Sequence, residues 1–184
     1  MADTSASQAE ATDEGGDLLL WILAWSELIT FGILLTGFLV VSLFQPVEFA
    51  AAKLQLSTRL AGFNTVVLLA SSWTAALAVH AGSNRRLQKL YLTATSVLGL
   101  GFITVKIIEY STELTVASDP AFGSFFELYF LITGFHLAHV VFLSLLLLLV
   151  ALRPRQANVV MATTIWHIVD LIWLVMFPLI YLAI

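Results

Sequence analysis

Five long apolar runs divide this chain, and their length limits what it can fold into. The runs cover residues 18–44, 60–81, 87–110, 124–152 and 158–183. Each is long enough to cross the hydrocarbon core of a bilayer as a helix, which takes ~20 residues. Membrane strands alternate apolar and polar residues over ~10 positions, and these runs do not alternate. The sequence therefore predicts an all-α fold, an integral membrane bundle of five transmembrane helices.

The overall composition supports a membrane protein and excludes several kinds of site. Of the 184 residues, 60% are hydrophobic and 11% are charged, whereas a soluble domain has about 25% charged residues. The chain has no cysteine, which excludes disulfides, thiolate metal sites and cysteine nucleophiles. Lys and Arg number only eight and form no basic stretch interleaved with aromatics, so we expect no nucleic-acid partner.

The segment before the first run differs from the rest of the chain. Residues 1–17 contain five acidic side chains among Ser, Thr and Ala: Asp3, Glu10, Asp13, Glu14 and Asp17. Such a segment is too polar to bury a core. We therefore predict a disordered acidic N-terminal tail over residues 1–17, followed by a transmembrane domain over residues 18–184.

Lys and Arg in the short loops between the runs predict the orientation, because loops rich in these residues stay in the cytoplasm. The side that holds the N-terminus carries Arg85, Arg86, Lys89, Arg153 and Arg155. The opposite side carries Lys53 and Arg59. We therefore expect the N-terminus in the cytoplasm and the C-terminus outside.

Strongly polar side chains occur inside three of the runs, where each is costly without a partner. They are Glu27 in the first run, His136 and His139 in the fourth, and His167 and Asp170 in the fifth. Successive helices alternate in direction across the membrane. Four of these side chains then come to a similar depth in the bilayer: Glu27, His139, His167 and Asp170. We therefore expect one buried polar cluster that joins the first, fourth and fifth helices.

The residue types in this cluster leave three interpretations open. Hydrogen bonds between His and carboxylates can hold helices together in a structural network. Buried carboxylates beside His can also handle protons. A metal or haem site is the third possibility, with His136, His139, His167 and Asp170 as ligands. The His-x-x-His spacing is a weak metal signal, and the His-Glu-x-x-His zinc motif is absent.

Lys106 and Glu109 have the i, i+3 spacing of a helical ion pair. They stand at the outer end of the third run, so we expect a structural bridge near the interface, with Lys106 extending toward the head groups. We place Tyr129 and Tyr181 partly in the interfacial aromatic belt.

Small and aromatic residues in the runs predict helix packing. Trp166 and Trp173 are seven residues apart and share a face with Asp170, so we expect them inside the bundle. The glycines suit close helix contacts, and they are Gly32, Gly37, Gly99, Gly101 and Gly134. Ser71, Ser72 and Thr74 in the second run suit the same kind of packing. Pro178 is expected to kink the last helix.

Five segments that carry these residues resemble subunit III of the haem-copper oxidases. They are WSELITFGILLTGF (25–38), FNTVVLLASSW (63–73), VKIIEY (105–110), TGFHLAHV (133–140) and WHIVDLIWL (166–174). Asn64 matches the family's asparagine in the second segment, which implies a helix-packing role. His136, His139, His167, Asp170 and Trp173 fall on the family's His and Asp motifs. The matches occur in order along all five runs, and together they are specific.

The resemblance implies the short, five-helix form of that subunit, in a bacterial inner membrane with a periplasmic C-terminus. The family's subunit holds no haem or copper and has no catalytic residues. It packs against the catalytic subunit, which carries haem with copper or non-haem iron, and it binds phospholipid between its helices. It also helps to sustain proton uptake, and Glu27 matches the family's carbodiimide-reactive glutamate. The resemblance thus favours the structural network and leaves a proton role open.

Two departures from the oxidase pattern favour the NorE-like accessory branch, which belongs to nitric-oxide reductase systems. Lys106 stands where many oxidase subunits have a neutral residue, and Glu127-Leu128-Tyr129 stands where they have small residues and Phe. Two alternatives remain: a stand-alone membrane metal- or haem-binding redox protein, and a small proton carrier. The determinants of the substrate, oxygen or nitric oxide, and of the electron donor, cytochrome c or quinol, lie on other subunits.

Overall fold

The computed structural model describes residues 2–182, with side chains described at residue 18 and from residue 20 onward. Every regular element in this range is helical. The elements are α1 (Ala2–Phe44), α2 (Pro46–Lys53), α3 (Thr58–His80), α4 (Arg85–Ala117), the 3-10 turn η1 (Pro120–Phe122), α5 (Gly123–Leu152), α6 (Gln156–Phe177) and the π-helical turn η2 (Pro178–Leu182). Five spans in this range are long and apolar enough to cross a membrane. The predicted all-α bundle of five transmembrane helices is confirmed.

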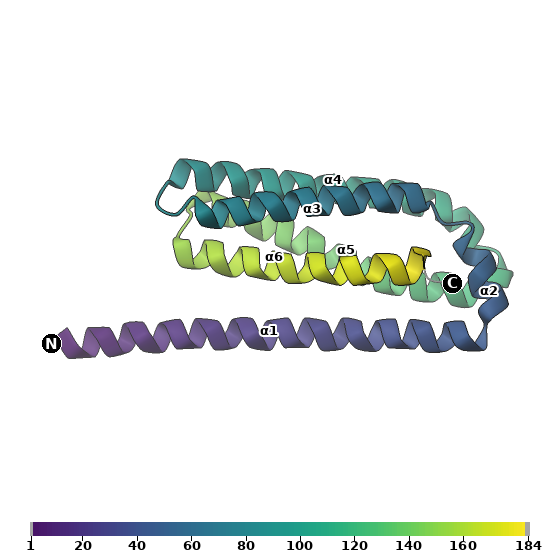
Figure 1. Ribbon diagram of the computed structural model, residues 1–184, viewed down its shortest axis with the longest axis horizontal. Helices are drawn as coiled ribbons and strands as arrows, with labels where there is room; N and C mark the ends of the chain where they lie inside the picture. Colours follow the sequence, from purple (N-terminus) through teal and green to yellow (C-terminus); the bar gives the residue numbers. More distant parts are fainter. Residues whose placement is uncertain (1, 183–184) are drawn as a thin grey trace.

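Four of the five long helices form a closed group, and α1 lies along its outside (Figure 1). α3 packs against α4 and α6, and α5 packs against the same two helices, so each of the four has two neighbours. Among the long helices in the described part of the chain, α1 makes its main contacts with α6 and α5. Half of the span in α6 is buried, against 17% of the span in α1. α6 is therefore the central helix, and α1 is the most peripheral.

Short turns with recognisable chemistry join the helices. Gly82 has a φ of 53° in the turn from α3 to α4, a left-handed conformation that glycine adopts without steric cost. Asn84 then caps α4, since its side chain accepts a hydrogen bond from the Leu87 N–H at 3.3 Å. On the other side of the bundle, Asp119 accepts from the Ala121 N–H at 2.9 Å and starts η1. These turns set neighbouring helices antiparallel.

Several helix boundaries differ from the predicted runs. α4 continues to Ala117, beyond the predicted end at residue 110, because the hydroxyls of Ser111, Thr112 and Thr115 bond to carbonyls of their own helix, each at 2.7 Å. Such bonds satisfy a polar side chain without ending the helix. The segment expected to be a loop after residue 44 contains α2.

The two ends of the chain also bear on the predictions. α1 includes residues 2–17, whose side chains lie outside those that the structure describes. The disordered acidic tail over residues 1–17 therefore stays a prediction. At the other end, the α-helical geometry of α6 stops at Phe177 and a π-helical turn begins at Pro178, the residue at which the sequence predicts a kink. A proline lacks the N–H that would continue the ladder.

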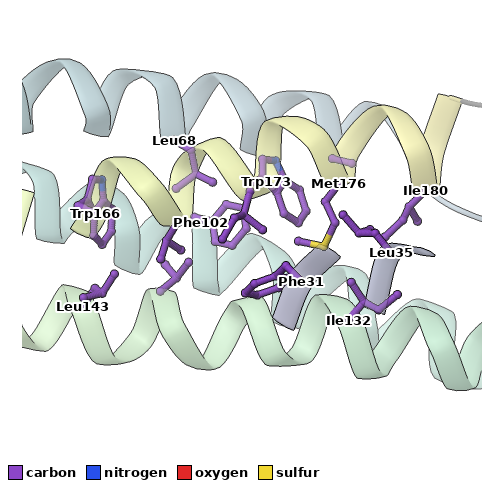
Figure 2. Packing of buried hydrophobic residues seen from close by; sticks show 14 of the residues in the cluster. Phe31, Leu35, Leu68, Phe102, Ile132, Leu143, Trp166, Trp173, Met176 and Ile180 are labelled. Atoms are coloured by element: carbon purple, nitrogen blue, oxygen red, sulfur yellow. The ribbon is translucent and has the colours of Figure 1, made fainter. Parts of the chain in front are cut away.

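Aromatic side chains fill the places where the helices meet. Phe38, Phe49 and Phe125 join α1, α2 and α5, with ring centroids 5.2 to 5.8 Å apart. Deeper in the bundle, Phe102 of α4 packs edge-on against Trp173 of α6 at 4.9 Å, as Figure 2 shows. These contacts place the apolar core along the inner face of α6.

Gly99 is the glycine at which close packing is required. A Cβ at this position would lie 2.6 Å from the ring of Trp166, and closer still to the hydroxyl of Ser144. By contrast, nothing lies within 4 Å of a Cβ built on Gly32, Gly37 or Gly101. The prediction of close packing at all five glycines is therefore wrong for these three, because no neighbouring atom approaches them closely.

Candidate functional site

The ion pair expected from the sequence lies inside the bundle. Nζ of Lys106 is 3.0 Å from Oε2 of Glu109, and both side chains are 0% exposed. The expected extension of Lys106 toward the head groups is wrong, because its side chain is enclosed by protein. α4 also continues about three helical turns beyond Lys106 before it ends at Ala117. The charge of Lys106 must therefore be satisfied by protein.

Two tyrosines from other helices complete the partners of this pair. Lys106 donates to the hydroxyl of Tyr129 on α5 at 2.7 Å and to that of Tyr181 in η2 at 2.6 Å. Tyr181 in turn donates to Oε1 of Glu109 at 2.7 Å. All three ammonium donors thus have acceptors. We call Lys106, Glu109, Tyr129 and Tyr181 the lysine network.

Aromatic faces enclose the ammonium group as well. Nζ of Lys106 lies 4.9 to 5.5 Å from the ring centroids of four residues: Tyr110, Tyr129, Trp173 and Tyr181. Rings at this distance attract a cation. Tyr129 and Tyr181 are therefore interior partners of a charge. Their placement in an interfacial belt was wrong, because the sequence does not show which helix face meets Lys106.

Sequence reasoning missed Glu113, which lies one turn beyond Glu109 on α4. Its side chain is 2% exposed, and neither carboxyl oxygen has a hydrogen-bond partner in the described structure. The i, i+4 spacing from Glu109 was the available signal. Glu113 therefore adds a second carboxyl beside the lysine network.

Glu27 and His139 form a separate pair between α1 and α5. Nε2 of His139 lies 3.2 Å from Oε1 of Glu27, and Nδ1 lies 2.8 Å from the Phe135 carbonyl. A nitrogen that faces a carbonyl must carry hydrogen. Nδ1 of His139 is therefore a donor to the carbonyl of Phe135, and Nε2 is the nitrogen that faces Glu27.

This pair lines an apolar cavity of about 480 Å³ between α1, α5 and α6. Leu23, Phe142, Met161 and Ile165 are among its other lining residues. The side chains of His139 and Glu27 are 23% and 17% exposed. The pair thus stands at the edge of the bundle.

His136 lies one turn from His139 but faces the interior. Its ring is 0% exposed and sits 5.3 to 6.1 Å from the ring centroids of Trp173, Phe102 and Phe31. Neither ring nitrogen has a hydrogen-bond partner among the described groups. His136 is therefore enclosed by aromatic rings and bonds to none of the other residues predicted to cluster with it.

His167 and Asp170 face α3, where Ser72 joins them. The Ser72 hydroxyl donates a short hydrogen bond to Oδ2 of Asp170 and lies 3.1 Å from Nδ1 of His167. Sequence reasoning assigned Ser72 only to helix packing. A serine pair in the middle of an apolar run, Ser71-Ser72, was the signal for a polar partner.

The single polar cluster expected from the sequence is therefore divided. Glu27 and His139 lie where α1 meets α5, His136 lies in the core, and His167 with Asp170 lies where α6 meets α3. Residues three apart on a helix are neighbours but differ by about 60° in direction. That difference turns His136 inward and His139 toward α1.

The ligand set of the metal interpretation is not assembled in this fold. Over the described residues, no group of three or more His, Asp or Glu side chains lies close enough to hold a metal ion. His136, His139, His167 and Asp170 point to different neighbours, as above. These four residues thus give no support to a metal centre in the described part of the chain.

The three predicted packing residues make polar contacts between helices. Asn64 donates to the Phe102 carbonyl at 3.2 Å, which ties α3 to α4. Nε1 of Trp166 donates to Ser71 at 3.1 Å and Nε1 of Trp173 to Thr65 at 3.0 Å, which ties α6 to α3. All three side chains are at most 1% exposed. These are contacts that a helix-packing role requires.

Comparison with known proteins identifies the family. The family model described as "Cytochrome c oxidase subunit III" matches residues 10–183. The chain belongs to the cytochrome c oxidase subunit III family. The match covers the transmembrane spans of the chain, including every polar group described above.

Individual relatives of this subunit III-like chain come from bacteria and animals. Cytochrome bo(3) ubiquinol oxidase subunit 3 of Buchnera aphidicola is 26% identical over 89% of this chain and 84% of its own length. Cytochrome c oxidase subunit 3 of Synechocystis is 31% identical over 81% of this chain and 67% of its own length. The lamprey Petromyzon marinus subunit is 38% identical over 64% of this chain. The chain matches about half (48%) of that animal subunit.

Proposed function

We propose that this chain is a non-catalytic subunit of a respiratory haem-copper complex in a bacterial inner membrane. There it supports the assembly, stability and proton uptake of a catalytic subunit that holds the haem, with copper or non-haem iron. The observation that carries the proposal is the family match over residues 10–183. The interior contacts support it, since the lysine network, Asn64 and both interior tryptophans bond from helix to helix.

Native purification tests this proposal. An affinity-tagged chain is expressed in its own organism, extracted in mild detergent and purified. We expect a haem-bearing catalytic subunit to co-purify and to give a reduced-minus-oxidised haem spectrum. A preparation that holds this chain alone, without haem, would contradict the proposal. Haem that stays with this chain after all other subunits have been stripped would contradict its non-catalytic role.

The cavity beside Glu27 and His139 supports a lipid role within that complex. Its wall is apolar apart from these two residues, and its volume of about 480 Å³ suits an acyl chain. We propose that phospholipid chains fill it and hold α1 against α5 and α6. Bound phospholipid is measured in the purified complex and in a variant with Leu146→Trp, whose larger side chain fills the cavity. We expect the variant to retain less phospholipid.

We propose the NorE-like branch from the two departures from the oxidase pattern. The two departures from the oxidase pattern, Lys106 and Tyr129, contact each other directly at 2.7 Å. A buried lysine requires such a partner, so the two departures belong to one structural unit. The relatives named above are all oxidase subunits, and the branch is tested by whether the co-purified complex reduces nitric oxide or oxygen.

We also propose the orientation that the loop charges predict. The N-terminus and the α3–α4 and α5–α6 turns, which carry most of the Lys and Arg, face the cytoplasm. The C-terminus faces the periplasm. Because the chain lacks cysteine, a single cysteine at Ser83 provides a test: a membrane-impermeant maleimide should label it in inverted vesicles and not in intact cells.

A further inference from the structure

Glu113 of α4 is a buried carboxyl that the contacts between helices do not use. It lies four residues after Glu109, on the same face of the helix. Its side chain is 2% exposed, and both carboxyl oxygens are buried without a hydrogen-bond partner in the described structure. A buried polar group without a partner is rare in a folded protein, so the state of this carboxyl needs a physical explanation.

The charges around Glu113 already balance without it. The charged and titratable side chains that interact with it are those of the lysine network and Tyr110. Lys106 and Glu109 form a pair of one positive and one negative charge at 3.0 Å. The tyrosines carry no charge in their ordinary state. An ionised Glu113 would therefore have no counter-charge of its own.

The hydrogens of the lysine network are also committed to other acceptors. Lys106 donates to Glu109 and to the two tyrosines of the network. Tyr181 donates to Oε1 of Glu109 at 2.7 Å. The shortest contact left for the hydroxyl hydrogen of Tyr129 is the oxygen of Tyr181, at 2.9 Å. Each donor in the network thus has an acceptor within the network.

The hydroxyls of Tyr110 and Thr112 are committed in the same way. Thr133 donates to the Tyr129 carbonyl at 2.6 Å, so the contact of 2.6 Å between Thr133 and Tyr110 requires Tyr110 to be the donor. Thr112, the residue before Glu113, donates to a carbonyl of its own helix at 2.7 Å. None of these described donors is left to stabilise a carboxylate at Glu113.

A proton is the occupant that these conditions select. A neutral acid is far less costly to bury than a carboxylate without donor or counter-charge. A metal cation does not fit, because Lys106 already occupies Glu109 and, among the described residues, no three His, Asp or Glu side chains lie close enough to hold one. α4 ends at Ala117, about 6 Å beyond Glu113 along the helix axis, so the route to solution is short. We propose that Glu113 binds a proton inside the bundle and exchanges it with solution near the α4–α5 turn.

Infrared spectroscopy of the full chain in nanodiscs tests the proposal. A protonated carboxylic acid gives a C=O stretching band that a carboxylate lacks, and an exposed glutamate is ionised at pH 7 because its pKa is about 4.3. The difference spectrum between the unchanged chain and Glu113→Gln, recorded at pH 7, is expected to show this band and to show it shifted to lower frequency in D₂O. A difference spectrum without a carboxylic acid band would overturn the proposal, and a band that keeps its frequency in D₂O would overturn the exchange.

A matched variant and a second measurement complete the test. Glu127→Gln changes an exposed glutamate on α5, and its difference spectrum should contain no carboxylic acid band; an equal band from both variants would contradict the assignment to Glu113. Solid-state NMR of the unchanged chain with ¹³C-labelled glutamate needs no variant, and at pH 7 the Glu113 carboxyl should have the chemical shift of a neutral acid. The shift of an ionised carboxylate would overturn the proposal. Co-purification with a haem subunit measures a different property, so the two proposals can fail independently.

Discussion

The lysine network and the pair Glu27–His139 are both polar groups at membrane depth, yet they are built differently. Lys106 and Glu109 are fully buried, and every ammonium donor has an acceptor. Glu27 and His139 are partly exposed, bond to each other and line a cavity. The interior network therefore joins α4, α5 and η2. The edge pair instead lines a cavity that protein side chains of this chain do not fill.

The Ser72, His167 and Asp170 group resembles the edge pair in this respect. It also lies where two helices meet and lines an open cavity. Position in the bundle therefore separates the fully enclosed polar groups from those beside open cavities. Residue type does not separate them, since both kinds contain carboxyls.

Removal of the buried lysine should have the largest effect. Lys106→Met leaves the carboxylate of Glu109 buried without its counter-charge, which costs about 3–5 kcal/mol. Unfolding of the purified chain in mixed detergent micelles, followed by circular dichroism, measures the loss. The double variant Lys106→Met/Glu109→Gln removes both charges and should recover most of the stability. A single variant as stable as the unchanged chain would show that the network does not hold the core together.

A methyl group at Gly99 should have the next largest effect. Gly99→Ala forces a Cβ against Trp166 and Ser144, and overpacking of this kind costs about 1–3 kcal/mol. Gly101→Ala is the matched control on the same helix, because nothing lies near its Cβ. The control should be neutral or slightly stabilising, since alanine favours helix. Equal effects of the two variants would contradict the close contact between α4 and α6.

Loss of the edge carboxylate should have a small effect. Glu27→Gln keeps a hydrogen-bonding group beside His139, and hydrogen bonds between helices in a membrane contribute only about 0.6 kcal/mol on average. Phe31→Ala is the informative comparison, because Phe31 is 2% exposed and packs against α5, and its truncation costs about 3–5 kcal/mol. A loss from Glu27→Gln as large as that from Phe31→Ala would mean that the pair, and not aromatic packing, attaches α1.

The sequence predicted the number and kind of helices because bilayer thickness fixes the length of an apolar run. It could not fix their ends, as α4 shows, where Ser111 and Thr112 satisfy their hydroxyls within the helix. It predicted that Lys106 pairs with Glu109, since that contact is local. The partners Tyr129 and Tyr181 come from other helices and were not predictable.

The same limit explains the divided cluster. Residue spacing gives the position of a side chain along its helix axis. It does not give the rotation of each helix about its axis. That rotation is set by packing, for example by Trp173 against Phe102, and it sends His139 to α1 and Asp170 to α3.

Labelling by an apolar carbodiimide tests the difference between interior and edge most directly. The reagent, dicyclohexylcarbodiimide, partitions into the bilayer and adds to carboxyls that it can reach. The full chain in membranes is treated for increasing times, and the modified carboxyls are mapped by mass spectrometry. We predict early labelling of Glu27 and Asp170, which line open cavities, and no early labelling of Glu109 or Glu113. Labelling of Glu109 or Glu113 before Glu27 would contradict the account.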